Sequence, residues 1–231
     1  MTTHYKTGYM KAYMLLVMGS FMTLAATAQK QVNKAEAQAA ALVKKMTLEE
    51  KVGQMTQVTM AVFAKGAWAN EDGELDPAAL KKAIVDYKVG SMLNTTAHAL
   101  PVEKWRSIMT QIQDEVKNTR LQIPVIYGLD AIHGQTYTLN STLFPQNIAM
   151  AAARNPELVR QAAKVTAMEL RSSGVRWNFA PVLDIGRQPL WSRFPETYGE
   201  DVYVVKTLGA AGIKAYEEDG LKNPTAVATS L

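Results

Sequence analysis

The sequence predicts an α/β fold with a parallel sheet, forming the N-terminal part of an eight-stranded (β/α)8 TIM-type barrel. Short apolar runs alternate with amphipathic helical segments over residues 53–229, which is typical of parallel strands joined by right-handed crossovers. No glycine-rich phosphate-binding motif follows any of these runs, which disfavours an open nucleotide-binding sheet. A complete barrel takes about 250 residues, and this chain supplies only four or five candidate strands. We therefore expect an incomplete barrel, cut short at Leu231.

The first 28 residues have the pattern of a cleaved signal peptide. Lys6 and Lys11 precede an apolar run over residues 12–25, and residues 26–28 read Ala-Thr-Ala, a cleavage pattern of small residues. The run is shorter than the roughly 20 apolar residues of a membrane span, which favours a signal peptide over an anchor. We expect residues 29–231 to be a periplasmic or secreted bacterial protein, with no membrane contact after cleavage.

The overall composition excludes several classes of function. The 231 residues carry a formal net charge of +4 without a basic block, so nucleic acid is not an expected partner. The absence of cysteine excludes disulfides and thiolate metal sites. Three histidines disfavour a histidine-rich metal centre. We therefore expect neither a metal nor another cofactor, and the composition leaves the oligomeric state open.

The first elements are predicted from composition and capping patterns. Residues 30–45 are polar and alanine-rich, as in a solvent-exposed helix. Thr47 and Glu50 have the spacing of a capping box, which predicts the start of a second helix. Residues 53–58 then run into a short strand.

The next helices and strand are predicted from proline positions and periodicity. Asp76 and Pro77 predict the start of a helix that extends to about residue 87. Residues 89–93 form an apolar run typical of a buried strand. Pro101 opens the following helix, whose core-facing stripe is Trp105, Ile108, Met109, Ile112 and Val116.

The segment over residues 123–134 predicts a buried strand followed by a functional loop. Residues 123–127 are apolar, and Gly128 is expected to end the strand. Asp130 follows directly, and the loop after a barrel strand is where substrate binds. Asp130 is alternatively a helix cap or turn residue. His133, three residues later, is interpreted as structural more readily than as catalytic.

A long helix and another strand come next. Asn155 and Pro156 predict the helix start, and Gly174 predicts its end. Residues 176–183 alternate in the manner of a strand. The residues expected to face inward from the helix are Leu158, Val159, Ala162, Val165 and Leu170.

The last third of the chain contains a long loop and one more unit. Asp184 sits at the exit of the preceding strand, and the loop extends to Asp201. A helix ending at Gly220 follows, and residues 225–229 begin a further strand.

Two acids at strand ends suggest hydrolytic chemistry. Asp130 and Asp184 could form the carboxylate pair of a glycosidase, one an acid and the other a nucleophile or base. Asp184 could instead only tie its loop to backbone amides. The loop between Asp184 and Asp201 contains arginines next to aromatic residues. Arginine suits vicinal hydroxyls, although an Arg–Glu lattice that merely stiffens the loop explains the same residues.

Together, four motifs resemble the N-terminal domain of glycoside hydrolase family 3, in its β-glucosidase-like branch. The similarity extends from about residue 46 to residue 231. The motifs are 46–55 (Met-Thr-Leu-Glu-Glu-Lys-Val-Gly-Gln-Met), 128–134 (Gly-Leu-Asp-Ala-Ile-His-Gly), 177–184 (Trp-Asn-Phe-Ala-Pro-Val-Leu-Asp) and 193–201 (Arg-x-x-Glu-x-Tyr-Gly-Glu-Asp).

The resemblance implies roles for individual residues. Asp130 and Arg193 correspond to family residues that bind hydroxyls of the sugar, and Asp184 then becomes structural. The family's more common loop reads Arg-Asp-Pro-Arg-Trp-Gly-Arg, and this chain has Leu190 in place of the second arginine. The family's Lys-His pair, nucleophile and acid/base are expected beyond Leu231, so we expect no catalytic residue within the chain.

The resemblance also implies a reaction. We expect hydrolysis of terminal non-reducing β-D-glucosyl residues from β-glucosides or oligosaccharides, with retention, by a longer enzyme that contains this chain. The chain alone is expected to be inactive. The alternatives are a β-xylosidase, another family 3 β-glycosidase, or a non-catalytic sugar-binding remnant.

Overall fold

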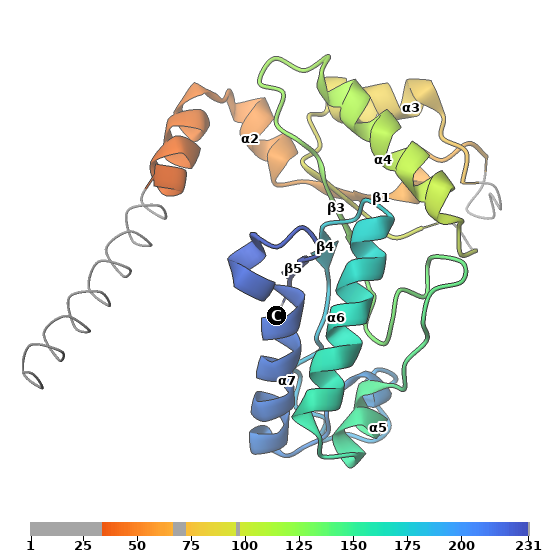
Figure 1. Cartoon of the computed structure of the whole chain (residues 1–231). Coiled ribbons are helices and arrows are strands. Elements are labelled where there is room, and N and C mark those ends of the chain that lie inside the picture. The colour runs from red at the N-terminus through yellow and green to blue at the C-terminus, as the bar shows by residue number, and fades with distance from the viewer. Residues whose placement is uncertain (1–33, 67–72, 96–97, 231) are drawn as a thin grey trace, which may run out of the picture. The chain divides into compact units, whose positions relative to one another are not determined.

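The computed structural model of the chain describes residues 34–66, 73–95 and 98–230 (Figure 1). The predicted signal peptide, residues 1–28, lies outside the described residues. The chain divides into two compact units, residues 1–51 and residues 52–231. Within the described ranges, no helix combines the length and the apolar character that crossing a membrane requires.

The first unit contains the two predicted N-terminal features. Residues 34–45 are helical. Thr47 and Glu50 form the predicted capping box at the start of α2 (Leu48–Gln54). The Thr47 amide donates to Glu50 Oε2 at 2.9 Å, and the Glu50 amide donates to Thr47 Oγ1 at 3.2 Å. The two bonds satisfy amides that would otherwise lack a partner in the first turn.

The second unit is organised on a five-stranded sheet whose strands are all parallel and follow one another in chain order. Met92 lies opposite Val58 on one neighbouring strand and Tyr127 on the other. In a doubly wound sheet, the spatial order of the strands reverses at a switch point. The strand order here does not reverse, as expected for part of a barrel. The strands are β1 (Gln57–Thr59), β2 (Ser91–Leu93), β3 (Ile126–Leu129), β4 (Trp177–Asn178) and β5 (Ala228–Thr229).

Helices connect these strands, and their starts follow local chemistry. The Asp76, Asn155 and Asp201 side chains cap helices by accepting backbone N–H groups two residues ahead, at 2.8, 3.0 and 2.8 Å. The helices are α3 (Pro77–Lys81), continued by the π-helical η2 (Lys82–Asp86), α4 (Val102–Val116), α5 (Asn147–Ala152), α6 (Pro156–Ser172) and α7 (Val202–Tyr216), with short 3-10 turns η1 (Met60–Val62), η3 (Phe194–Glu196) and η4 (Glu218–Leu221).

The main core packs α4 against the sheet and also takes in buried residues of α3, η2, α6 and α7. All five residues of the predicted α4 stripe are buried. Trp105 meets Tyr127 of β3 edge to face, with ring centroids 5.8 Å apart, a favourable arrangement for aromatic rings. A smaller apolar cluster joins α5, α6 and α7, and α6 and α7 lie side by side (Figure 1).

All five strands have bounds that differ from those predicted, and for two of them the structure shows the reason. β3 begins at Ile126 and continues through Gly128, which was expected to end it. A Cβ at position 128 would lie 2.3 Å from Cζ of Phe179, so the glycine makes room for that ring rather than breaking the strand. β4 is limited to Trp177–Asn178 instead of residues 176–183. Pro181 has no N–H with which to continue the sheet ladder.

The buried face of helix α6 agrees only in part with the prediction, since Val159 and Leu170 are buried as expected and the other predicted residues are not. Leu158 is 45% exposed, whereas Thr166 is buried and its hydroxyl donates to the Ala162 carbonyl at 2.9 Å. The internal hydrogen bond lets a polar residue occupy the buried face. The buried residues of α6 are Val159, Ala163, Thr166, Ala167 and Leu170.

Candidate functional site

Polar side chains from two separate segments line a cavity of about 390 Å³ at the carboxyl end of β3. Asp130 comes directly after β3, while Arg193 belongs to the segment between β4 and α7. The structure therefore brings the two predicted site residues into one cavity. Asp184 is not among the lining residues, which are Asp130, Ile132, His133, Thr136, Tyr137, Gln146, Arg193 and Glu196.

Asp130 occupies an intermediate position between solvent and protein. Its burial raises the pKa of the carboxyl group; the charge of Arg193 opposes this rise, and that of Glu196 adds to it. Among the residues that the structure describes, none donates a hydrogen bond to the Asp130 carboxylate. A partly desolvated carboxylate with open acceptor positions is suited to binding hydroxyl groups.

The backbone next to Asp130 is fixed by a buried asparagine. The Ala131 amide donates to Asn178 Oδ1 at 3.0 Å, and Asn178 Nδ2 donates to the Ala131 carbonyl at 3.2 Å. Both residues are fully buried. Asn178 of β4 thus clamps the loop that follows β3. Asn178 was not among the predicted site residues, although a polar residue within an apolar strand is an available signal.

His133 is held by backbone contacts. Its Nδ1 lies 2.9 Å from the Phe144 carbonyl oxygen, which makes Nδ1 the donor. The Phe144 amide in turn donates to the His133 carbonyl at 2.8 Å. The two bonds join the loop after β3 to the segment before α5. This geometry favours the structural interpretation of His133, although its ring also lines the cavity.

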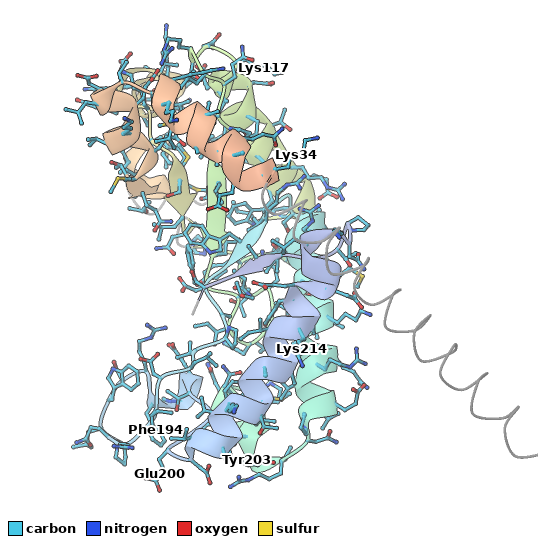
Figure 2. All side chains as sticks on the ribbon, turned by 90° about the vertical axis from the view of Figure 1, so that its left-hand side faces the viewer. Lys34, Lys117, Phe194, Glu200, Tyr203 and Lys214 are labelled. Atoms are coloured by element: carbon cyan, nitrogen blue, oxygen red, sulfur yellow. The ribbon has the colours of Figure 1, made fainter. Side chains whose placement is uncertain are left out.

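Arg193 and Glu196 form an ion pair across one turn of η3. Arg193 Nε and Nη2 lie 2.7 and 2.6 Å from the same oxygen, Glu196 Oε2. Hydrogen bonding to Glu196 raises the pKa of Arg193, and the charges of Glu196, Asp130 and Asp184 add to that rise. Figure 2 shows the neighbouring Phe194 on the segment that leads into α7. The pair is therefore both a loop contact and part of the cavity wall.

Other lining residues escaped prediction. The Tyr137 carbonyl accepts hydrogen bonds from Leu100 N at 3.0 Å and Trp105 Nε1 at 2.9 Å. Burial raises the pKa of Tyr137, and the charges of Asp130 and Glu196 raise it further. Tyr137 lies in an irregular segment between β3 and α5, where no periodic pattern marks a residue as lining a site.

The described residues contain no cluster of three or more histidine, cysteine or acidic side chains arranged to hold a metal ion. The side chains that line the cavity include two carboxylates, one guanidinium group and one tyrosine.

Comparison with known proteins identifies the family. Residues 47–230 match the sequence profile of the glycosyl hydrolase family 3 N-terminal domain. The chain belongs to glycoside hydrolase family 3. This confirms the resemblance drawn from the four motifs and supports a glycosidase-like function.

The curated relatives are longer than this chain. A lysosomal beta glucosidase of Dictyostelium discoideum is 37% identical over 204 residues, which are 82% of this chain and 24% of that protein. A periplasmic beta-glucosidase of Salmonella typhimurium is 31% identical over 192 residues, 82% of this chain and 22% of that protein. A beta-xylosidase of Formosa agariphila is 33% identical over 144 residues, 60% of this chain and 20% of that protein. The chain spans about a quarter of the length of the first two.

Solved structures show the same fold. The beta-glucosidase from Listeria innocua in complex with glucose matches with a TM-score of 0.66 at 30% identity, over 84% of this chain and 26% of that one. An exo-1,3/1,4-beta-glucanase from a Pseudoalteromonas species matches with a TM-score of 0.70 at 29% identity, over 85% of this chain and 31% of that one. These matches and the parallel sheet confirm the predicted α/β, barrel-type fold.

Proposed function

We propose that this chain supplies one side of the sugar pocket of a retaining exo-β-glycosidase, which releases terminal non-reducing β-D-glucosyl residues from β-glucosides or oligosaccharides. The observation that carries the proposal is that Asp130 and Arg193 line one cavity. Asp130 accepts hydrogen bonds from sugar hydroxyls, and each charge-assisted bond contributes about 1.5–3 kcal/mol. Arg193 offers a planar set of donors that suits adjacent hydroxyls.

The names of the relatives support a β-glucoside as substrate. Two of them are β-glucosidases, and one matching structure contains glucose. The Formosa agariphila relative is a β-xylosidase, so a β-xyloside is the second candidate substrate. A periplasmic relative, together with the signal-peptide pattern of residues 1–28, supports export as the location.

We infer that the reacting carboxyl groups belong to other parts of the enzyme. Retaining hydrolysis needs two carboxyl groups about 5–5.5 Å apart, one of which becomes the nucleophile. The family resemblance assigns neither role to an acid of this chain, and the relatives are about four times longer. Asp130 and Arg193 then bind the sugar without reacting with it.

Assays with aryl glycosides test the proposal. The complete gene product that carries this chain should hydrolyse 4-nitrophenyl β-D-glucoside, and NMR should show β-glucose as the first product. The 231-residue chain alone should not hydrolyse this substrate. Preferential hydrolysis of the β-xyloside would select the second candidate, and glucose binding without hydrolysis of either substrate would select a sugar-binding remnant. Turnover by the chain alone that is lost in Asp184→Asn would restore the Asp130–Asp184 pair.

A further inference from the structure

Two Arg–Glu pairs in this chain have the same spacing of three residues but different geometry. On α6, Arg160 Nε and Nη2 contact separate oxygens of Glu157, at 2.7 and 2.6 Å. In η3, both nitrogens of Arg193 contact the single oxygen Oε2 of Glu196. Neither member of the α6 pair lines the cavity, whereas both members of the η3 pair do.

We propose that Glu196 is a positioning residue that aims the Arg193 guanidinium into the cavity, so that Arg193 and Asp130 hold neighbouring hydroxyls of one sugar. This inference rests on the proposed function. Glu196 engages only Nε and one N–H of Nη2, which leaves the Nη1 edge of the guanidinium as the donor face. The opposite charges of Asp130 and Arg193 influence each other, which is consistent with a shared substrate between them.

Glu196 is the better-anchored member of the pair. Asn147, which is buried, donates from Nδ2 to the Glu196 carbonyl at 2.8 Å. The Glu196 amide donates to the Arg193 carbonyl at 3.0 Å. The next residue, Thr197, is fully buried and donates from Oγ1 to the Phe194 carbonyl at 2.9 Å. These bonds fix the backbone of Glu196, and from that position its carboxylate restrains the long arginine side chain.

Arg193 needs such a restraint. Its side chain is 49% exposed, compared with 25% for Glu196. An exposed arginine samples many rotamers, and fixing one of them costs conformational entropy. If the donor is oriented before the substrate arrives, that entropy is not lost during binding. Without Glu196, the same guanidinium would still be present but would point into the cavity only part of the time.

Substitutions in the complete enzyme test this role. We expect Glu196→Ala to lower kcat/KM for 4-nitrophenyl β-D-glucoside by about fivefold, because the Arg193 guanidinium would then point into the cavity only part of the time. Glu196→Gln should lower it less, because the amide oxygen still accepts a hydrogen bond. The matched control is Glu157→Ala, which breaks the pair on α6 and should change kcat/KM by less than about twofold.

A double-mutant cycle separates positioning from direct contact. In an Arg193→Ala background, Glu196→Ala should cause no further loss, because Glu196 would have no guanidinium left to orient. A further loss as large as in the wild-type background would overturn positioning and show that Glu196 contacts the sugar itself.

A spectroscopic readout does not depend on activity. In the complete enzyme, the Arg193 Nε–H signal, assigned with Arg193→Lys, should exchange slowly with water. Glu196→Ala should make it exchange fast, and Glu157→Ala should leave it unchanged. An unchanged Arg193 signal in Glu196→Ala would overturn the inference.

The outcomes for the two proposals are distinguishable. A wild-type enzyme that hydrolyses no β-glycoside overturns the proposed function, and this inference with it. An active wild-type enzyme in which Glu196→Ala and Glu157→Ala behave alike overturns only the inference about Glu196.

Discussion

Helix α4 and the cavity around Asp130 both adjoin strand β3, yet they are built in different ways. The buried stripe of α4 repeats at helical spacing and packs as one continuous face. The cavity is lined by irregular segments that lie far apart in the chain. The comparison shows that periodicity predicts packing, whereas a site depends on contacts between distant segments.

The two regions meet at Trp105. Its ring is fully buried against Tyr127, and its indole N–H donates to the Tyr137 carbonyl. Tyr137 is part of the cavity wall. The core helix therefore supports the wall of the cavity, although their functions differ.

The largest expected effect concerns the core. Ile112 of α4 is fully buried, and Ile112→Ala should lower the free energy of unfolding by about 2–5 kcal/mol, because it removes apolar contacts and leaves a cavity. Urea unfolding of the chain measures this. The neighbouring Gln111 is exposed, so Gln111→Ala should stay within about 0.5 kcal/mol of wild type. Equal effects of the two substitutions would contradict the assigned core.

In contrast to Ile112→Ala, the substitution Asp130→Asn should strongly lower activity and preserve the fold. Replacing a charged acceptor by a neutral one should lower kcat/KM for an aryl β-glucoside by more than about tenfold, or about 1.4 kcal/mol. The control is Asp114→Asn, since Asp114 is exposed, pairs with Lys117 and does not line the cavity. Near-normal activity of Asp130→Asn would refute the proposed sugar contact.

Arg193→Lys should have a smaller effect, because the positive charge is retained. Lysine lacks the planar set of donors and cannot reproduce the two contacts with Glu196 Oε2. We expect kcat/KM to fall by about fivefold, or about 1 kcal/mol. Kinetics identical to wild type would assign Arg193 to loop stability alone.

The sequence predicted most of the fold, because helix starts and core stripes are local properties. Asp76 and Asn155 cap helices as expected, and the α4 stripe is buried in full. The errors arose where a residue distant in the sequence determines the local structure. Gly128 accommodates the ring of Phe179, and no local pattern carries that information.

The candidate site was predictable only in part. Asp130 and Arg193 were identified through family motifs, and the structure brings them to one cavity; their binding of sugar stays a prediction. Tyr137 and Asn178 escaped, because their roles arise from hydrogen bonds to Trp105 and Ala131 across the fold. Sequence spacing does not encode those contacts.

The smallest expected effect sharpens the contrast between core and cavity. Burial raises the pKa of Asp130 in the folded chain, relative to an ordinary value of about 3.9 in the unfolded chain. Between these two pKa values the folded state binds more protons, so stability falls as pH rises through the folded-state pKa. Below the unfolded-state pKa, Asp130 is protonated in both states. Asparagine resembles that protonated form at every pH.

Asp130→Asn should therefore raise the melting temperature at pH 7, and the difference from wild type should shrink towards zero as the pH falls below about 4. The gain should be smaller than the three effects above, because Asp130 is only half-buried and solvent screens its charge. Thermal unfolding of both proteins across this pH range measures it. A variant less stable than wild type at pH 7 would show that attraction to Arg193 outweighs the cost of burying the carboxylate. If Asp130→Asn raises the melting temperature, the two regions respond in opposite ways. Removing a core side chain destabilises the fold, whereas removing the cavity charge stabilises it, because that charge is retained for binding.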